Sequence, residues 1–437
     1  MKVTFSVYTK RKEIKRLSAM LGIAAIVFSF LDSESSLAQS PQNFSWSNVP
    51  AFSMAGDLKA YWNVVDASMG EMAKNAHDRG FKPVTILSTY RDVPYARNEK
   101  GSGAKDLSNH WLNPWLRSPS FEAAIRHNIE KARPVSRGIY VHDIELPIVR
   151  DTKQAWMNEA TRQAAGSVSR ETFDENYFSE WAKWFQLPLE WTNERYPGVD
   201  AGIYGIQPFD WDDHILTKNA SQIHDTHQAD WRLWKLVEPY VDFAVASIYF
   251  NYDNPDSVFY MAANVEANYL RTHSSGGKPV YAYEWMRFTR IDPELKGKEL
   301  PSYLVEAMAI VPYFSGAKGV VLWGWEPQVK SGTQQPYEQL PLFVRSLKRV
   351  ATLSEKLARG RLLIDRPAHE VWKAHGPLIR KVMVDDDECI VMAINPWQSD
   401  DKRTTYPVQC GQLSAQISVD GRHTTLAVLN RRGLQIY

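Results

Sequence analysis

Apolar runs of strand length alternate with helical segments along most of this chain, and this alternation limits the fold more than any other feature. The helical segments carry apolar residues at spacings of three and four, and glycine or proline often separates them from the next apolar run. Strands separated by helices of this length run parallel. The expected strands are 51–54, 83–89, 138–145, 201–206, 241–250, 279–285 and 319–325, and the expected helices are 57–76, 118–133, 172–195, 221–237, 256–272, 302–314 and 340–358.

About seven parallel strands predict an α/β fold, a (β/α) TIM-like barrel in complete or incomplete form. An open nucleotide-binding sheet is less favoured, because no glycine-rich phosphate loop follows the first strand. From about residue 362 the pattern changes to short alternating runs at 371–374, 378–384, 389–394, 416–419 and 424–429, with Asp420-Gly421 as a hairpin turn. The sequence therefore predicts a barrel domain over 39–360 and a small antiparallel β domain over 361–437.

The first 38 residues resemble a secretory signal. They open with basic residues, continue with an apolar stretch over 17–31 and end in Ser36-Leu37-Ala38, a small-residue pattern before a cleavage point. The apolar stretch is shorter than a spanning helix needs, which favours cleavage over a membrane anchor. We expect a periplasmic or secreted protein that has no stable membrane insertion after cleavage.

Charge and cysteine usage exclude several classes of partner. The formal net charge is +1, and removing the excess of three positive charges in residues 1–38 leaves −2, so no basic footprint for nucleic acid remains. The only cysteines, Cys389 and Cys410, are expected to form a disulfide in an oxidising compartment, with buried free thiols as the alternative. No spacing of cysteine or histidine is typical of a metal site, so we expect no metal and no cofactor.

The run 138–147 ends in two carboxylates, Asp143 and Glu145. Side chains two apart on a strand share a face, so these two acids should point the same way. At the C-terminal end of a barrel strand, carboxylates are typical of catalysis. Two neighbouring acids oppose each other's ionisation, so one can keep a proton and act as a general acid on a glycosidic bond. A strand-end pair that binds loop amides or an arginine is the structural alternative.

Aromatic and polar side chains follow the ends of the other expected strands. Tyrosine hydroxyls and carboxylates bind sugar hydroxyls, while indole faces stack on the apolar faces of sugar rings. Aromatic residues on the helices, such as Trp181 and Trp231, fill the core instead. The candidate substrate-binding residues at strand ends are Tyr90, Asp210, Glu284, Trp285, Trp323 and Trp325, and the strand-end Tyr204 and Tyr249 are candidates for the catalytic site. We expect a polysaccharide or oligosaccharide partner.

The order of these motifs resembles the hyaluronidase family of glycoside hydrolases. The matching segments are 138–145 with its Asp-x-Glu pair, 202–205 followed by Pro208, 247–249, 278–283 and 315–324, which together span the barrel. The resemblance implies that Glu145 is the proton donor, that Asp143 orients the N-acetyl group of the substrate, and that Tyr204, Tyr249 and Trp323 line the cleavage subsite. This chain differs in having Ile144 between the acids and Leu146-Pro147 after them.

Three functions remain open from the sequence. In the first, an exported glycosidase uses the acetamide of an N-acetylhexosamine as the nucleophile, with Glu145 as acid and Asp143 assisting. In the second, Glu145 is acid and base and Glu284 is the nucleophile of a conventional retaining enzyme. In the third, the chain is a non-catalytic glycan-binding envelope protein that keeps the barrel and its aromatic cleft.

Overall fold

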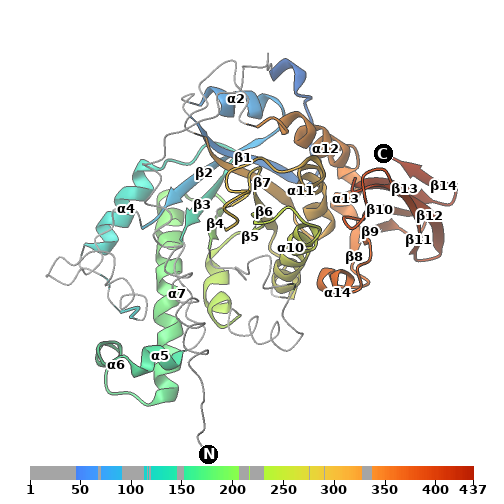
Figure 1. Cartoon of the computed structure of the whole chain (residues 1–437). Helices are drawn as coiled ribbons and strands as arrows, with labels where there is room; N and C mark the ends of the chain where they lie inside the picture. The colour runs from blue at the N-terminus through green and yellow to red at the C-terminus, as the bar shows by residue number, and fades with distance from the viewer. Residues whose placement is uncertain are drawn as a thin grey trace, which may run out of the picture.

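The structure is a computed structural model that describes residues 46–66, 70–90, 113–115, 117, 120–144, 152–205, 216, 231–274, 276–289, 291–326 and 337–437. Seven parallel strands form one sheet in the order β4-β3-β2-β1-β7-β6-β5, and helices surround it (Figure 1). The predicted TIM-like barrel is confirmed. Its strands are β1 (Lys59–Asp66), β2 (Lys82–Ser88), β3 (Ile139–Asp143), β4 (Ala201–Tyr204), β5 (Ala244–Ser247), β6 (Val280–Trp285) and β7 (Gly319–Glu326).

The barrel closes between β4 and β5. Gly202 and Phe243 form a parallel bridge, and the Asp242 N–H donates to the Ala201 carbonyl at 2.8 Å. A Cβ on residue 202 would lie 2.3 Å from the Phe243 ring, so glycine is needed at this junction. The closed sheet has an interior filled by side chains from alternate strand positions, among them Val141, Tyr204, Val245, Tyr283 and Val321.

Helices cover the outside of the barrel and carry most of the core. The 26-residue α7 (Arg170–Arg195) is capped by Ser169, whose side chain accepts from the Thr172 N–H, and it continues through Pro188. Helix α11 (Ser302–Phe314) is buried over almost its whole length, between the barrel and α12. The remaining helices in the described part of the barrel region are η1 (Trp46–Asn48), α2 (Glu71–Asp78), α4 (Phe121–Lys131), α5 (Thr152–Met157), α6 (Glu159–Ala165), η3 (Glu238–Tyr240), α10 (Asp256–Ser274), α12 (Leu340–Thr352) and α13 (Ser354–Arg359).

The first strand is the main correction to the expected elements. The sequence placed a strand at 51–54 and a helix over 57–76, but the structure has β1 at Lys59–Asp66 and only the short α2 after it. Both faces of β1 are covered, since Trp62 and Val64 pack in the core around the barrel and Tyr61 lies in the interior. A strand that is apolar on both faces loses the two-residue alternation, so its apolar residues also fit a helical spacing.

The C-terminal part contains two antiparallel sheets that lie beside the barrel, next to α10, α11 and α13 (Figure 1). One has the order β14-β13-β10-β9-β8 and the other pairs β11 with β12. Buried Arg380 of β9 forms an ion pair with Glu266 of α10 at 2.5 Å and so connects the sheet to the barrel. The elements are β8 (Arg361–Leu363), α14 (Ala368–Lys373), β9 (Leu378–Asp385), β10 (Glu388–Ile394), β11 (Arg403–Cys410), β12 (Leu413–Asp420), β13 (Thr425–Asn430) and β14 (Gly433–Ile436).

Two expectations for this part are wrong. Residues 371–374 lie at the end of α14 rather than in a strand. The turn at Asp420-Gly421 joins β12 to β13, but these strands do not form a hairpin, because β12 pairs with β11 whereas β13 pairs with β10. A turn signal gives the position of a chain reversal without saying which strands pair across it.

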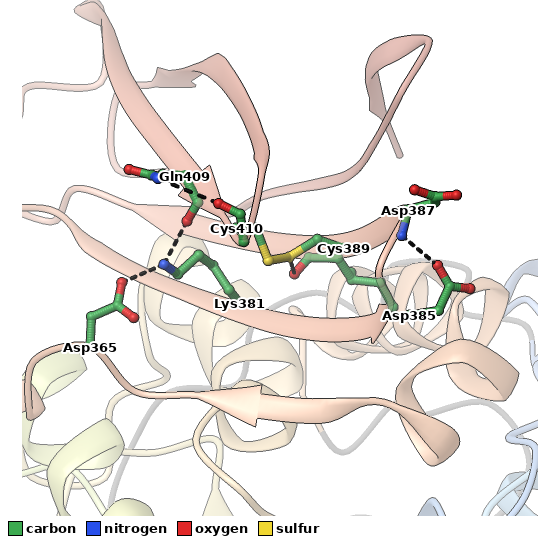
Figure 2. Close-up of a disulfide and its surroundings, with 9 residues drawn as sticks. Asp365, Lys381, Asp385, Asp387, Cys389, Gln409 and Cys410 are labelled. Carbon is green, nitrogen blue, oxygen red and sulfur yellow. Dashed lines mark hydrogen bonds and ion pairs between the residues drawn. A yellow bond between two sulfur atoms is a disulfide. The ribbon is translucent and has the colours of Figure 1, made fainter.

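Cys389 and Cys410 form the expected disulfide, with an S–S distance of 2.02 Å (Figure 2). The bridge joins β10 of the larger sheet to β11 of the smaller one, and Lys381 of β9 adds a second connection by donating to the Gln409 carbonyl at 2.7 Å. Lys381 also pairs with Asp365. In the chain-entropy model a disulfide that closes a loop of this length contributes about 3 kcal/mol.

Candidate active site

Asp143 ends β3 at the C-terminal mouth of the barrel, with its side chain on the interior face. The interior position follows from strand alternation, since Ile139 and Val141 lie in the interior cluster. The Ser88 hydroxyl of neighbouring β2 donates to Asp143 Oδ2 at 3.1 Å. Burial raises the pKa of Asp143 to about 6, and the hydrogen bond from Ser88 opposes this rise. Asp143 is therefore a carboxyl of raised pKa at the barrel mouth.

His142 holds β3 from the outer side of the barrel wall. It is fully buried, with Nδ1 2.8 Å from the Thr89 hydroxyl and Nε2 2.9 Å from the Thr192 hydroxyl on α7. Burial lowers the pKa of His142 to about 3, so the ring is neutral at physiological pH. Both ring nitrogens have a partner, and the pair of contacts fixes β3 against α7 so that Asp143 keeps its direction into the mouth.

Four aromatic rings form a continuous wall at the mouth. Tyr204, the register partner of Asp143, lies 6.1 Å from Tyr249 between ring centroids. Tyr249 lies 5.5 Å from Trp323, which meets Trp285 edge to face at 5.3 Å. The Tyr204 hydroxyl is 2.9 Å from that of Ser247. Tyr204 is buried, whereas Tyr249, Trp285 and Trp323 are partly exposed. Partly exposed rings beside a carboxyl are suited to binding a sugar.

Trp325 and Val65 extend the apolar surface to the rim. They are register partners on β7 and β1, and they share the strand parity of Trp323 and Asn63. Their exposed fractions are 45% for Trp325 and 39% for Val65, unusual for apolar residues at a barrel strand end. Trp325 therefore offers an indole face next to the aromatic wall.

Two expected binding residues lie away from the mouth. Tyr90 is buried between Phe121 and Trp184, at 5.8 and 5.5 Å between ring centroids, and its hydroxyl donates to the Trp184 carbonyl. It belongs to the core between the barrel and α4 and α7, because the chain turns outward after β2. The expectation that Tyr90 binds substrate is not supported by this position.

Glu284 is the second such residue. It alternates with Tyr283 and Trp285, so its side chain leaves the barrel interior and enters the layer between β6 and the helices. There it is fully buried, and neither carboxyl oxygen has a hydrogen-bond partner among the described residues. Burial raises the pKa of Glu284 well above its ordinary value. The structure does not bring Glu284 and Asp143 to the same side of the barrel wall.

Two further candidates, Glu145 and Asp210, lie outside the described residues. Their roles stay predictions from the sequence.

Several side chains at the mouth were missed from the sequence. Ser88 contacts Asp143, Ser247 contacts Tyr204, and Asn63 donates to the Tyr283 hydroxyl at 3.0 Å. Tyr283 could have been found, because it shares strand parity with Trp285. Asn63 could not, because β1 was interpreted as a helix. The described residues contain no group of three histidine, cysteine, aspartate or glutamate side chains that could hold a metal ion.

A scan against protein-family models finds no match, and neither does a search of curated proteins. Among solved structures, bee venom hyaluronidase in complex with a hyaluronic acid tetramer matches at 16% identity over 61% of this chain and 90% of that chain, with a TM-score of 0.46. Alpha-L-fucosidase isoenzyme 2 from Paenibacillus thiaminolyticus matches at 11% identity over 68% of this chain and 41% of that chain, with a TM-score of 0.41.

A double mutant of an endo-beta-1,4-mannanase from Cellulomonas fimi matches at 10% identity over 84% of this chain and 79% of that chain, with a TM-score of 0.34. The resemblance to hyaluronidases inferred from the sequence is thus confirmed as a remote one. At these values the matches identify neither a family nor a substrate. No helix in the described part of the chain has the length and apolar character required to cross a bilayer.

Proposed function

We propose that this protein is an exported glycoside hydrolase that cleaves a glycan containing N-acetylhexosamine. The observation that carries the proposal is the position of Asp143, a carboxyl of raised pKa that faces the barrel mouth beside a wall of aromatic rings. The C-terminal mouth is where barrel enzymes place their catalytic groups. Glu145 follows Asp143 by two residues, and we assign it the role of proton donor.

In the proposed reaction, Glu145 protonates the glycosidic oxygen as the bond to the anomeric carbon breaks. The acetamide oxygen of the same sugar attacks that carbon and forms a cyclic intermediate with a positive charge. Asp143 accepts a hydrogen bond from the acetamide N–H and stabilises this charge. Glu145 then takes a proton from a water whose oxygen attacks the anomeric carbon. This attack breaks the bond between that carbon and the acetamide oxygen and gives a product of retained configuration. Tyr204 and Tyr249 line the subsite where this takes place.

The aromatic wall supplies the binding surface for the sugar. Trp323 and Trp285 offer ring faces, and the pair of hydroxyls from Tyr204 and Ser247 offers polar contacts. Trp325 at the rim stacks on a neighbouring sugar of the same chain. This combination of apolar faces and few polar groups matches the two kinds of surface on a sugar ring.

The position of Glu284 favours the substrate's acetamide as nucleophile over the conventional two-carboxylate mechanism. A carboxylate nucleophile must lie roughly 5 Å from the acid and on the substrate side of the wall. Glu284 lies on the helical side of the β6 strand and is fully buried. It would have to cross the barrel wall in order to attack a sugar at the mouth.

Export is supported by two independent features. Residues 1–38 have the pattern of a secretory signal, and the chain's two cysteines form a disulfide. Disulfides persist in oxidising compartments such as the periplasm or the extracellular space.

The test is a screen of matched glycans with and without the N-acetyl group, using the mature protein and Glu145→Gln. We expect cleavage only of glycans that carry the acetamide, and a loss of about 10²- to 10⁴-fold in Glu145→Gln, because the amide cannot deliver a proton. Activity of Glu145→Gln within a few-fold of wild type would refute the assignment. Tight glycan binding without any cleavage would favour a non-catalytic glycan-binding protein.

A further inference from the structure

The loop between β5 and α10, residues 248–255, carries Tyr249 of the aromatic wall. The barrel holds the first half of this loop. The Phe250 carbonyl accepts from the Thr289 N–H at 2.8 Å, and the Thr289 hydroxyl donates to the side-chain oxygen of Asn251. These contacts fix the backbone directly after Tyr249 against the segment that follows β6.

The C-terminal part of the chain, residues 361–437, contacts the other end of the loop and the start of α10. Trp372 Nε1 donates to Asp256 Oδ1 at 2.7 Å, and Trp397 stacks on Phe259 at 5.6 Å between ring centroids. Asp256 and Phe259 both lie in the first turn of α10. A third contact reaches the loop itself.

This third contact runs from Arg422 through Tyr303 to Asp253. Arg422 lies on the turn between β12 and β13, and its guanidinium carbon is 4.1 Å from the centre of the Tyr303 ring on α11. The hydroxyl of buried Tyr303 donates to Oδ1 of Asp253 in the loop at 2.9 Å. Burial raises the pKa of Tyr303, and the charge of Arg422 opposes this rise, which makes the hydroxyl a stronger donor.

The neighbours of Arg422 fix its direction. Its guanidinium makes two hydrogen bonds to Asp400, at 2.8 and 3.0 Å. Gly421 has a φ of +54°, and a Cβ on it would lie 2.6 Å from the Asp400 backbone, so this close turn requires glycine. The Thr424 N–H donates to Glu306 of α11 at 2.9 Å, which docks the same turn on the helix that carries the stacked ring. The guanidinium is therefore held in place over that ring.

We propose that the C-terminal part holds the β5–α10 loop in place at the barrel mouth, and that Arg422 is a positioning residue for Tyr249 that acts through Tyr303 and Asp253. The barrel then fixes the loop at one end and the C-terminal part fixes it at the other. A ring that lines the cleavage subsite must keep its place, because small displacements of positioning groups cost rate. The catalytic consequence rests on the proposed function, whereas the position of the loop does not.

The experiment is hydrogen–deuterium exchange of the purified protein, followed by mass spectrometry of peptides that cover 248–255. Arg422→Ala should speed exchange in this loop about fivefold, because the loop loses one of its attachments. Arg422→Lys, which keeps a positive charge over the ring, should restore most of the protection. The matched control is Arg431→Ala, which removes an arginine paired with Asp387 on the next turn of the same sheet and should leave exchange in the loop unchanged.

Unchanged exchange in Arg422→Ala, or an equal increase in Arg431→Ala, would overturn the proposal. Thermal denaturation verifies that each variant folds. Tyr303→Phe tests the route, because it keeps the ring beneath Arg422 and removes only the hydroxyl that holds Asp253. It should also speed exchange in the loop, and it decides the question if Arg422→Ala does not fold. Normal protection of the loop in Tyr303→Phe would count against the proposal.

Activity supplies a second readout if the protein is the proposed glycosidase. Arg422→Ala should lower kcat/KM about fivefold, and Arg422→Lys should recover most of the loss. In a double-mutant cycle with Tyr249→Ala, the two losses should not multiply, since both act on the same ring. Fully multiplicative losses would show that Arg422 does not act through Tyr249. If no glycan is cleaved at all, the proposed function fails while the exchange measurement still tests the position of the loop.

Discussion

Asp143 and Glu284 are two strand-end carboxyls of the same barrel that occupy opposite sides of its wall. Asp143 faces the mouth, where Ser88 donates to it and where its register partner is Tyr204 of the aromatic wall. Glu284 faces the helical layer, where it is fully buried without a hydrogen-bond partner among the described residues. Burial raises the pKa of both carboxyls, to about 6 for Asp143 and well above the ordinary value for Glu284.

The difference shows that a raised pKa alone does not identify a catalytic acid. Desolvation acts in the same way on a carboxyl in an active site and on one trapped in a core. Strand parity separates the two cases here, because Glu284 lies between the inward-facing Tyr283 and Trp285. A carboxyl can take part in the chemistry only if its side chain reaches the solvent-connected mouth.

The largest expected effect that separates the two sides is the pH dependence of catalysis. Asp143 must be ionised in order to stabilise positive charge, so kcat/KM should fall about tenfold per pH unit below an apparent pKa of about 6. Rates measured from pH 4 to 8 on an N-acetylhexosamine glycan test this. This fall in kcat/KM at low pH should be absent in Asp143→Asn and unchanged in Glu284→Gln. If the fall disappeared in Glu284→Gln and persisted in Asp143→Asn, Glu284 and not Asp143 would be the group whose ionisation controls catalysis.

Next in size is the stability of Glu284→Met. The folded pKa of Glu284 lies above the unfolded value of 4.5, so its stabilising contribution is complete below pH 4.5 and is lost as the pH rises towards the folded pKa. Replacing this buried, unpaired carboxyl by an apolar side chain should raise the free energy of unfolding at pH 8 by about 1 to 3 kcal/mol. Chemical denaturation at pH 5 and pH 8 measures it. Destabilisation at pH 8 would indicate that Glu284 has a partner.

The smallest expected effect is at the rim. Trp325→Ala should raise KM about fivefold with little change in kcat, because a lost stacking face costs about 1 kcal/mol and affects binding more than chemistry. Tyr240→Ala is the matched control, since Tyr240 is also exposed but precedes β5 at the opposite end of the barrel. Equal effects of the two substitutions on KM would show that Trp325 is not part of the binding surface.

The sequence predicted the barrel and most of its later elements because helices and strands alternate with clear turn signals. Helix α11 was predicted with its observed bounds, Ser302–Phe314. Strand β1 was not predicted, because its two apolar faces conceal the alternation, and Asn63 was missed with it. In the C-terminal part, β11 was missed because its alternating residues are largely polar and exposed.

The candidate site was predictable for residues that lie at a strand end and whose side chains also point into the barrel. Asp143, Tyr204, Tyr249, Trp285 and Trp323 are brought together as expected at the strand ends. Tyr90 and Glu284 were expected at the mouth but lie away from it, for one reason. A position near a strand end does not determine on which side of the barrel wall the side chain lies. Alternation along the strand from an inward-facing Trp285 would have predicted that Glu284 points outward and that Tyr283 points inward.

The most direct test of the account compares Asp143→Asn with Glu284→Gln in one assay on an N-acetylhexosamine glycan. We expect Asp143→Asn to lose about 10²- to 10³-fold in kcat, because the neutral amide cannot stabilise the charge on the cyclised acetamide. Glu284→Gln should stay within a few-fold of wild type. An inactive Glu284→Gln that is rescued by azide, beside an active Asp143→Asn, would contradict the account and make Glu284 the nucleophile.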